Sequence, residues 1–540
     1  MIKNDIHSGK EFKEKLLAGI HKVSSAVSST LGAKGQTVII QKEFQIPHIT
    51  KDGVTVAKAI ELKDNIENIG AKLIKQASEQ TNREAGDGTT TSTLLASSMV
   101  GEGYKYVTAG VDSNAIRRGM EKTTKMIVKE LEGMSKEITT EEEIKAVANV
   151  SANGDKELSD IVSEALTIAG KDGIIMVENS PDDVTYFEKH DGYSIDRGFH
   201  SPYFSTDMNK FECVYENASI LLVNGNLDSV QPLTTLLNEV SSKGEKLCIF
   251  CDAVTQEVLQ IFIQNKMRGV INCCLIKNDG FGQTKLDILN DIAIITGTKV
   301  FNTDTGDDFT KIKSTDLGTA KKIVADRDKT TILKTDKIDA ELITTRVATL
   351  QDKVKDTSSA HEKKTLEKRI AKLSGGIGVI FVGASTETEL KEKKDRLDDA
   401  TNATKSALDS GVVTGAGLAL YKLSEEITPD ETFTNEELFG FKVIMSAIKQ
   451  PAKVILKNAG LEASVILNKI VESEFELKYD VRKDEYLKSD DISIIDPTKV
   501  VKYALIYASS TASLILTSNF AVVTEDQPDM DLLERSSGVL

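Results

Sequence analysis

Tryptophan is absent from this chain of 540 residues, prolines number only 8, and aromatic residues make up only 5%. The 5 cysteines are odd in number and too few for a disulfide-stapled scaffold of this length. With 40% hydrophobic and 28% charged residues, the composition is otherwise that of an ordinary globular protein. These proportions exclude a collagenous, a disulfide-rich and a mostly disordered protein, and the length predicts about three or four domains.

Positive charge is in short supply as well. Lys and Arg together number 67 against 83 Asp and Glu, which gives a net charge of -16. Because such a charge repels polyanions at long range, we expect neither nucleic acid nor a membrane as a partner. The negative net charge is still compatible with a small phosphate ligand that is held by backbone amides and a metal ion.

Apolar runs that approach the ~20 residues of a membrane span are missing, and the first residues lack the pattern of a secretory signal or a transit peptide. We therefore expect a cytoplasmic protein. The Cys248-Ile-Phe-Cys251 spacing and the nearby Cys273-Cys274 pair are compatible with zinc or redox chemistry. Both lie in apolar runs typical of strands, where side chains three apart point to opposite faces, so we favour core packing.

Helical periodicity dominates the first third of the chain. Apolar residues recur at spacings of three and four over residues 12–31, 66–77, 94–99 and 116–131, which predicts four amphipathic helices. Short apolar runs at 37–41 and 54–57 predict extended segments between the first two helices. The Thr50-Lys-Asp-Gly-Val54 stretch is typical of a turn.

The middle of the chain has a different pattern. Apolar runs at 220–223, 247–251 and 270–276 alternate with helical stretches up to residue 295, which is the signature of a sheet covered by helices. Only one glycine follows the first of these strands, so a dinucleotide-binding fold loses support. Further helices are expected at 338–372 and 387–408. Glycine clusters near residues 86 and 415 suggest that the middle is inserted into a domain made from both ends.

The most informative stretch is Ala85-Gly-Asp-Gly-Thr-Thr-Thr91. Glycines allow the backbone to approach phosphate closely, amides at the start of the next helix attract the anion, and threonine hydroxyls add donors. The carboxylate of Asp87 could hold the Mg2+ that accompanies a nucleotide. Helix caps alone would explain only part of the stretch, so we predict a phosphate site.

Motifs of the common phosphate-handling enzymes are absent. The chain has no GxxxxGK[ST], no kinase HRD or DFG set and no Ser/His/Asp hydrolase signature, and its 6 histidines are scattered. The residues alone therefore predict a multidomain protein with a nucleotide site of another kind and a mobile central domain.

Eight motifs occur in the order found in group I chaperonins, the GroEL type, so the chain is identified as resembling that family over nearly its whole length. They are Leu31-Gly-Ala-Lys-Gly35, Thr50-Lys-Asp-Gly-Val-Thr-Val-Ala57, Ala85-Gly-Asp-Gly-Thr-Thr-Thr91, Ser151-Ala-Asn153, Asp196-Arg-Gly198, Ser201-Pro-Tyr-Phe204, Gly280-Phe-Gly282 and Asp496-Pro-Thr-Lys-Val500. The resemblance implies a multidomain fold of α plus α/β type. Its parts are a helical equatorial domain (1–136 and 411–540), a small α/β intermediate domain (137–191 and 377–410) and an α/β apical domain (192–376), with hinges at Gly192 and Gly376.

The resemblance also implies an ATP site in the equatorial domain. The nucleotide is lined by Thr30, Leu31, Gly32 and Lys51, its phosphates by Gly86, Asp87, Gly88, Thr89, Thr90 and Thr91, and its ribose and base by Gly415 and Asp496. Mg2+ binds at Asp87, with K+ as an optional second cation. The catalytic carboxylates that position and activate water are Asp52 and Asp399. Asp399 is preferred to Asp398 because it begins the Asp399-Ala-Thr-Asn-Ala-Thr404 run.

A second site is implied in the apical domain, where an apolar groove binds unfolded chains. The matching positions are Phe199, Tyr203, Phe204, Leu237, Leu259 and Ile263. Without the resemblance, Leu237, Leu259 and Ile263 would be interpreted as core faces of helices that cover a sheet.

The sequence departs from the family pattern at several positions. Ala33 replaces a proline, Glu137 stands where a hinge proline is usual, Ala416 interrupts a triple glycine, Thr234 and Gln264 replace apolar groove residues, and the Gly-Gly-Met tail is absent. These departures indicate a divergent member. The protein is then either bacterial or encoded by a virus, and in the second case it acts in the infected host cell. Docking of a co-chaperonin lid is left open as well.

The expected function is that of an ATP-hydrolysing chaperonin subunit that forms a homo-oligomeric heptameric ring or double ring and folds unfolded client proteins in a cavity. Two alternatives are kept. One is a ring-forming scaffold with weak or no ATP turnover. The other, a metabolic enzyme with a phosphate-bearing substrate, is disfavoured because no pocket chemistry accompanies the glycine loops.

Overall fold

The computed structural model of the chain describes residues 4–41, 47–152, 154–169, 174–190, 192–208, 210–302, 307–335, 338, 340–357, 359–375 and 377–524. The chain divides into two compact units. The first consists of Met1–Ser163, Asn179–Val184 and Val382–Leu540, and the second of Glu164–Glu178 and Thr185–Phe381. The first unit is thus built from both ends of the chain. The finer division into equatorial, intermediate and apical domains stays a prediction.

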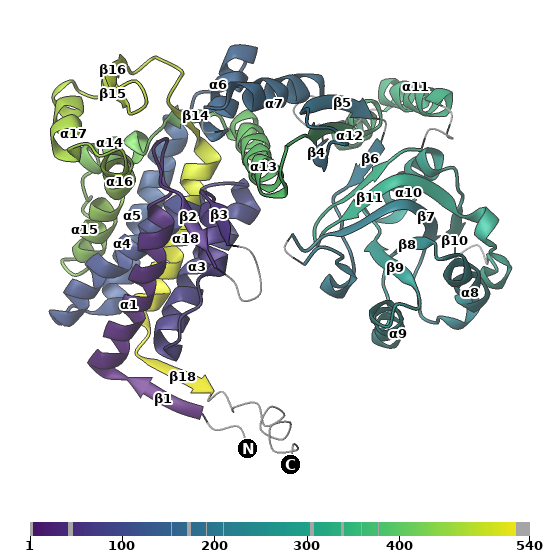
Figure 1. Cartoon of the computed structure of the whole chain (residues 1–540), viewed down its shortest axis with the longest axis horizontal. Coiled ribbons are helices and arrows are strands. Elements are labelled where there is room, and N and C mark those ends of the chain that lie inside the picture. The colour runs from purple at the N-terminus through teal and green to yellow at the C-terminus, as the bar shows by residue number, and fades with distance from the viewer. Residues whose placement is uncertain are drawn as a thin grey trace. The chain divides into compact units, whose positions relative to one another are not determined.

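The first unit is mainly helical (Figure 1). Its elements are β1 (Asn4–Ser8), α1 (Gly9–Ser28), β2 (Val38–Ile40), β3 (His48–Thr50), α2 (Gly53–Ala59), α3 (Asn65–Ala85), α4 (Thr89–Thr108), α5 (Ser113–Gly133), α6 (Glu141–Ser151), α13 (Glu387–Ser410), β14 (Val412–Thr414), α14 (Leu418–Glu426), α15 (Glu437–Ala447), α16 (Gln450–Asn458), α17 (Ala463–Glu472), β15 (Leu477–Asp480), β16 (Glu485–Lys488), β17 (Ile495–Pro497), α18 (Thr498–Thr517) and β18 (Phe520–Thr524). The chain passes from the first unit into the second within α7 (Lys156–Ala169).

Five long helices from the two ends of the chain form the core of this unit. Helix α18 packs on α3, α4 and α5, and α1 packs on α3 and α4, so the purple and yellow ends of the chain belong to one bundle (Figure 1). Their apolar stripes meet in one cluster that includes Ile20, Ile74, Met99, Ile127 and Leu505. The four helices predicted for the first third of the chain are confirmed. The prediction of an extended segment at 54–57 is wrong, because these residues belong to α2.

Helix α18 corrects one expectation about apolar runs. Its length and its mean hydropathy of 1.3 make it the one described helix that could cross a membrane by length and composition. However, 61% of its most apolar window is buried inside the protein, where it packs against α3, α4 and α5. A central core helix meets the same criterion, so the apolar run is explained by packing.

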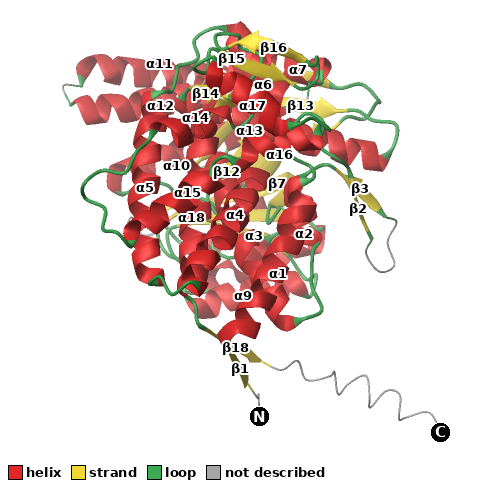
Figure 2. Ribbon diagram, turned by 90° about the vertical axis from the view of Figure 1, so that its left-hand side faces the viewer, coloured by secondary structure: helices red, strands yellow, loops and turns green. Residues whose placement is uncertain are grey.

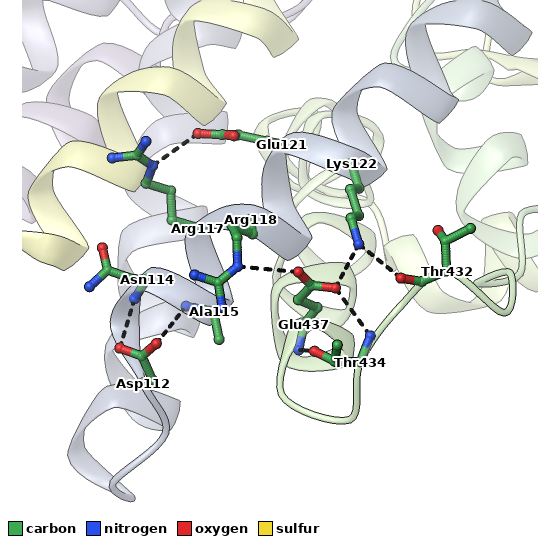
Figure 3. Close-up of polar contacts among 10 residues, drawn as sticks. All are labelled: Asp112, Asn114, Ala115, Arg117, Arg118, Glu121, Lys122, Thr432, Thr434 and Glu437. Atoms are coloured by element: carbon green, nitrogen blue, oxygen red, sulfur yellow. Dashed lines mark hydrogen bonds and ion pairs between the residues drawn. The ribbon is translucent and has the colours of Figure 1, made fainter.

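Helices α5 and α15 cross at two glycines. A Cβ on Gly119 would lie 2.0 Å from the carbonyl oxygen of Glu437, and one on Gly440 would lie 2.2 Å from a carbonyl of α5. Beside the crossing, the Glu437 carboxylate accepts from Lys122 at 2.7 Å and from Arg118 at 3.3 Å (Figure 3). Lys122 above all lowers the pKa of Glu437 to about 2. The pairing therefore stabilises the crossing at neutral pH and is lost as the pH falls toward that value.

The second unit is a sheet covered by helices. Its elements are β4 (Ile174–Asn179), β5 (Tyr186–His190), β6 (Gly192–Ile195), the 3-10 helix η1 (Pro202–Phe204), β7 (Cys213–Asn224), η2 (Gln231–Leu233), α8 (Thr234–Lys243), β8 (Lys246–Cys251), α9 (Gln256–Met267), β9 (Asn272–Lys277), α10 (Gly282–Thr296), β10 (Val300–Asn302), η3 (Phe309–Lys311), η4 (Ser314–Asp316), β11 (Gly318–Ala325), β12 (Thr330–Leu333), α11 (Ala340–Asp356), α12 (Ala360–Gly375) and β13 (Ile377–Val382).

The main sheet of the second unit has the order β6-β12-β11-β7-β8-β9, with β10 also beside β7. Strands β7, β8, β9 and β10 are parallel, and Cys248 pairs with Ile220 on one side and Cys274 on the other. The alternation predicted between 220 and 295 is confirmed. A smaller sheet has the order β4-β13-β5.

Candidate functional site

Two glycines in left-handed conformations shape the loop between α3 and α4. Gly86, with φ 73°, ends α3, and Gly88, with φ 88°, precedes α4. A Cβ on Gly86 would lie 2.5 Å from Cβ of Asn402, and one on Gly88 would lie 2.8 Å from Cγ1 of Val500. The predicted turn therefore needs glycine both for its backbone and for the space around it.

Helix α4 begins in this loop without a side-chain cap, whereas an aspartate that precedes each of α2, α3 and α5 bonds to its first amides. The internal ladder of α4 starts with the N–H of Ser92, which donates to the Gly88 carbonyl at 2.9 Å. The earlier amides and the positive end of the helix dipole are thus available to an anion. The first turn holds Thr89, Thr90 and Thr91.

The carboxylate of Asp52 caps helix α2. It accepts from the N–H of Val54 at 3.0 Å and from that of Thr55 at 2.8 Å, which is why residues 54–57 are helical. Gly53 lies against the first turn of α4, since a Cβ there would be 2.1 Å from Oγ1 of Thr90. Asp52 is thereby held beside residues 85–91, which we call the glycine–threonine loop.

Helix α13 brings Asp399 to the same loop. Asn402 and Ser406 lie on the same helix face as Asp399, at spacings of three and four. Asn402 abuts Gly86, and Oγ of Ser406 donates to the carbonyl of Ala85 at 2.7 Å. The segment before α2, helix α13 and helix α18 therefore converge on residues 85–91.

Carboxylates crowd this site. Burial above all, and then the charge of Asp52, raises the pKa of Asp87. Burial, followed by the charges of Asp87 and Asp52, raises the pKa of Asp399 well above its usual range. Burial and the charge of Asp87 raise the pKa of Asp496 to about 6. Such mutual repulsion is relieved when a cation enters the site.

The loop after α1 is held by helix α16. The amide of Asn458 donates to the carbonyls of Ser28 and Leu31, both at 2.9 Å. Gly32, with φ 89°, lies against Ile455, whose Cγ2 would be 3.0 Å from an added Cβ. Thr30, on the same loop, donates to the Val27 carbonyl at 2.8 Å, and both Lys51 and Ala33 are exposed.

Strands β14 and β17 bring Gly415 and Asp496 together. Val413 pairs with Asp496, and a Cβ on Gly415 would lie 3.1 Å from Oδ1 of Asp496. The carboxylate accepts from the backbone N–H groups of Ala416 and Gly417. Ala416 has φ 55°, so the alanine that interrupts the glycine run occupies a conformation that glycine adopts at lower cost.

Several residues at this site were not singled out by sequence reasoning. The contacts of Asn402 and Asn458 became apparent only from the packing of α13 and α16, although Asn402 lies within the motif that starts at Asp399. A small apolar pocket of about 20 Å³ was also missed, which is room for roughly one water molecule. It is lined by Ala416, Leu418, Ala452, Ile455, Leu456, Leu467, Ile470, Tyr479 and Val481.

The donors fit a magnesium ion that arrives with phosphate. Among the described residues no group of three or more His, Cys, Asp or Glu side chains is arranged to hold a metal. Mg2+ is usually bound by one or two carboxylates together with substrate phosphates and water. The half-buried Asp87, beside the uncapped start of α4, supplies such a carboxylate.

The six apolar residues predicted to bind clients have different environments in the second unit. Tyr203 is 64% exposed, whereas Phe199 and Phe204 are buried in the core of the unit. Leu237, Leu259 and Ile263 are partly buried and pack against that core. Tyr203 is therefore the one of the six that is exposed, and binding by the other five stays a prediction.

Polar residues replace apolar ones on the two helices that belong to the predicted client site. Thr234 and Gln264 are exposed on α8 and α9, where the family pattern has apolar residues. The ammonium of Lys266 donates to the carbonyls of Phe204 and Ser205, so α9 holds the η1 turn. This surface is consequently less apolar than the family pattern implies.

All five cysteines are buried and free. Burial raises the pKa of Cys248, Cys251, Cys273 and Cys274, which favours the neutral thiol. They contribute to the hydrophobic core of the second unit, as the core-packing interpretation predicts.

Of the two predicted hinge residues, Gly192 is described. It is buried in β6, and a Cβ there would lie 2.2 Å from Cδ1 of Ile377 and 2.5 Å from the carbonyl oxygen of Ile332. Glycine is required by close packing at this position. Gly376, Asn153 and the C-terminal stretch 525–540 lie outside the described residues.

Comparison with known proteins gives the same result by sequence and by structure. The sequence model of the TCP-1/cpn60 chaperonin family matches residues 23–526. The mitochondrial chaperonin CPN60 of Euglena gracilis is 40% identical over 529 residues, which cover 97% of this chain and 93% of that protein.

Two crystal forms of the chaperonin gp146 from the Pseudomonas aeruginosa bacteriophage EL, both studied in the presence of ATP-BeFx, have a similar fold. Form II has a TM-score of 0.70 at 20% identity and covers 96% of this chain and 99% of that chain. Form I has a TM-score of 0.61 at 19% identity and covers 97% and 99%. At this level of identity the likeness concerns the fold.

Proposed function

Because the chain belongs to the TCP-1/cpn60 chaperonin family, in its group I branch, and is a chaperone of that kind, we propose that it is an ATP-hydrolysing subunit of a folding ring. The ring captures non-native polypeptides on the second unit and folds them in an enclosed cavity. ATP binding and hydrolysis in the first unit drive the cycle in the cytoplasm of a bacterium or of an infected host cell.

One observation carries the ATP part of this proposal: Asp52, Asp87 and Asp399 surround the uncapped first turn of α4. The free amides of residues 89–91 bind the phosphates, and the glycines at 86 and 88 allow the backbone to approach them. The residue that would hold Mg2+ is Asp87, and the ion supplies charge neutralisation on the phosphates. The crystals of gp146, which has a similar fold, were studied in the presence of ATP-BeFx, in keeping with a nucleotide ligand.

The two remaining carboxylates handle the attacking water. Both carboxylates orient the water, and Asp399 accepts its one proton, because the raised pKa of Asp399 makes that carboxylate a stronger base. Because Asp399 is carried by α13, a shift of that helix couples hydrolysis to motion elsewhere in the chain.

Ring assembly is supported by two small sheets with exposed apolar residues in the first unit. The β1–β18 pair exposes Ile6, Phe520 and Val522, and the β2–β3 pair exposes Ile39 and Ile49. Figure 2 shows both pairs standing out from the helices of this unit. Two-stranded sheets are marginal alone and their open edges accept further strands. We infer that copies of the chain join at these edges into a heptameric ring or double ring.

The test is steady-state hydrolysis of ATP with Mg2+, together with the native mass with and without ATP. Asp399→Ala should lower the turnover number by about 100-fold or more and leave nucleotide binding intact, since the residue acts on water. Asp398→Ala, the neighbour on the same helix, is the matched control and should keep most of the activity. Normal turnover in Asp399→Ala would overturn the assignment.

Rings without turnover in the wild type would instead favour the alternative, a chaperonin-like scaffold that has lost hydrolysis. A monomer at all concentrations and nucleotide states would contradict both. We propose that any co-chaperonin lid binds weakly, because Thr234 and Gln264 expose polar side chains on α8 and α9.

A further inference from the structure

A lysine is buried next to the candidate nucleotide site. Lys478, on β15, is only 1% exposed although its side chain carries an ammonium group. The ammonium donates to the carbonyl of Asp491 and lies 3.4 Å from the carbonyl oxygen of Ile494. Burying a charge costs free energy unless it is well bonded, so a merely space-filling role would be served better by an apolar residue.

The carbonyl of Ile494 connects this lysine to the predicted ribose and base contacts. The same oxygen accepts the N–H of Gly415 at 3.1 Å. Gly415 adjoins the carboxylate of Asp496, and Ile495 pairs with Thr414 in the β14–β17 ladder. Lys478 therefore bonds to the segment that supports Gly415 and Asp496.

Strand β15 also builds the wall of the small apolar pocket. Tyr479 and Val481 line that pocket together with Ala416 and Ile455. Because successive side chains of a strand point to opposite faces, Tyr479 faces the pocket while Lys478 faces the 491–494 segment. One lysine thus connects β15, which carries Tyr479 of the pocket lining, to the 491–494 segment.

The charges around Lys478 both favour and oppose the ammonium. Burial has the largest influence and lowers the pKa of Lys478. The carboxylates of Asp491 and Asp490 favour the protonated amine, whereas the charge of Lys136 opposes it. The segment 490–494 supplies the favourable charges, so the bond between β15 and this segment depends on the protonated amine.

We propose that Lys478 is a positioning residue of the nucleotide site, which ties β15 to the segment that supports Gly415 and Asp496 so that a purine nucleotide binds tightly. This inference rests on the proposed ATP site. It adds that affinity, rather than the chemical step, depends on a buried cation that contacts no nucleotide.

The experiment uses Lys478→Met in the full-length assembled protein, because methionine fills similar volume without charge. Affinity for ADP with Mg2+, measured by calorimetry, should fall by about 10-fold or more, the loss expected when a charged hydrogen bond is removed. The turnover number at saturating ATP should stay within about two-fold, so the defect appears in KM. Lys483→Met, in the same hairpin, removes an exposed cation and should change neither value.

The conservative variant keeps the test decisive if Lys478→Met does not assemble. Lys478→Arg keeps a permanent charge and its donors, so its ADP affinity should stay constant as the pH rises from about 7.5 to 10, whereas that of the wild type should weaken. Equal affinity in wild type and Lys478→Met, or equal pH profiles in wild type and Lys478→Arg, would overturn the inference while leaving the ATP site standing. A wild type that binds no ADP would overturn the proposed function itself.

Discussion

The two candidate sites differ in how their residues are used by the fold. In the first unit, residues before α2, on α13 and on β17 surround the loop before α4, and their carboxylates repel one another. In the second unit, of six apolar residues expected at a client surface, Tyr203 is exposed and the others are partly or fully buried. The polar and glycine-rich motifs therefore converge in the fold, whereas the six apolar residues do not form one exposed surface.

The physical reason is that a hydrophobic core is not stabilised by clustered glycines and carboxylates. Gly86 and Gly88 have left-handed backbone, and the carboxylates of Asp87 and Asp399 lie close together despite their mutual repulsion, which core packing alone does not favour. An apolar residue at helical spacing serves a core equally well, and Phe204 does so. The predictions below test this contrast.

The largest effect is expected at the client site. Phe204→Ala removes a fully buried ring and should lower the free energy of unfolding by about 3–5 kcal/mol, because a cavity is left behind. Tyr203→Ala, one position away and exposed, should change it by less than about 0.5 kcal/mol. Thermal or denaturant unfolding of both variants measures the difference.

Client capture, unlike stability, should depend on the exposed Tyr203. Tyr203→Glu should abolish suppression of aggregation of an unfolded protein while basal ATP hydrolysis persists, because a charge replaces the exposed ring. Light scattering during refolding is the measurement. Unimpaired capture by Tyr203→Glu would remove the contrast between the two neighbours.

A smaller effect is expected at the nucleotide site, where Asp496 has a pKa of about 6. This pKa lies above the ordinary value, so ionisation destabilises the fold, and the penalty develops as the pH rises from about 4 to 6. Asp496→Asn should therefore raise stability at pH 7 by about 1–3 kcal/mol and give no gain near pH 4. Unfolding is followed without nucleotide or Mg2+.

Asp409→Asn serves as the control for this titration, because Asp409 is half exposed on α13 and makes only a long contact to Lys499. Its stability curve should run parallel to that of the wild type at every pH. A gain for Asp496→Asn that persists at pH 4 would show that charge is not its cause.

The smallest effect is expected at Ala416. Ala416→Gly should stabilise the first unit by about 1 kcal/mol, because glycine adopts φ 55° without the strain of a Cβ. Ala109→Gly removes the same methyl group at φ -77° and should give no gain. A comparison of unfolding midpoints decides, and equal shifts in both variants would argue against strain at Ala416.

Much of the fold follows from local pattern. The spacing of apolar residues predicted α1, α3, α4 and α5, and the alternation after residue 219 predicted β7 to α10. The error at 54–57 arose because a short apolar run does not distinguish strand from helix. The Asp52 carboxylate decided the matter by capping α2, which depends on bond geometry rather than on composition.

By itself, the sequence determined the family, the glycine–threonine loop and the carboxylates of the candidate ATP site, because these rest on backbone conformation and chemistry that only a few residue types supply. Tertiary structure alone decided that Asn402, Asn458 and Lys478 support that site and that Phe204 belongs to the core. Such roles depend on contacts between segments hundreds of residues apart. No local pattern encodes them, since burial is a property of the packed chain.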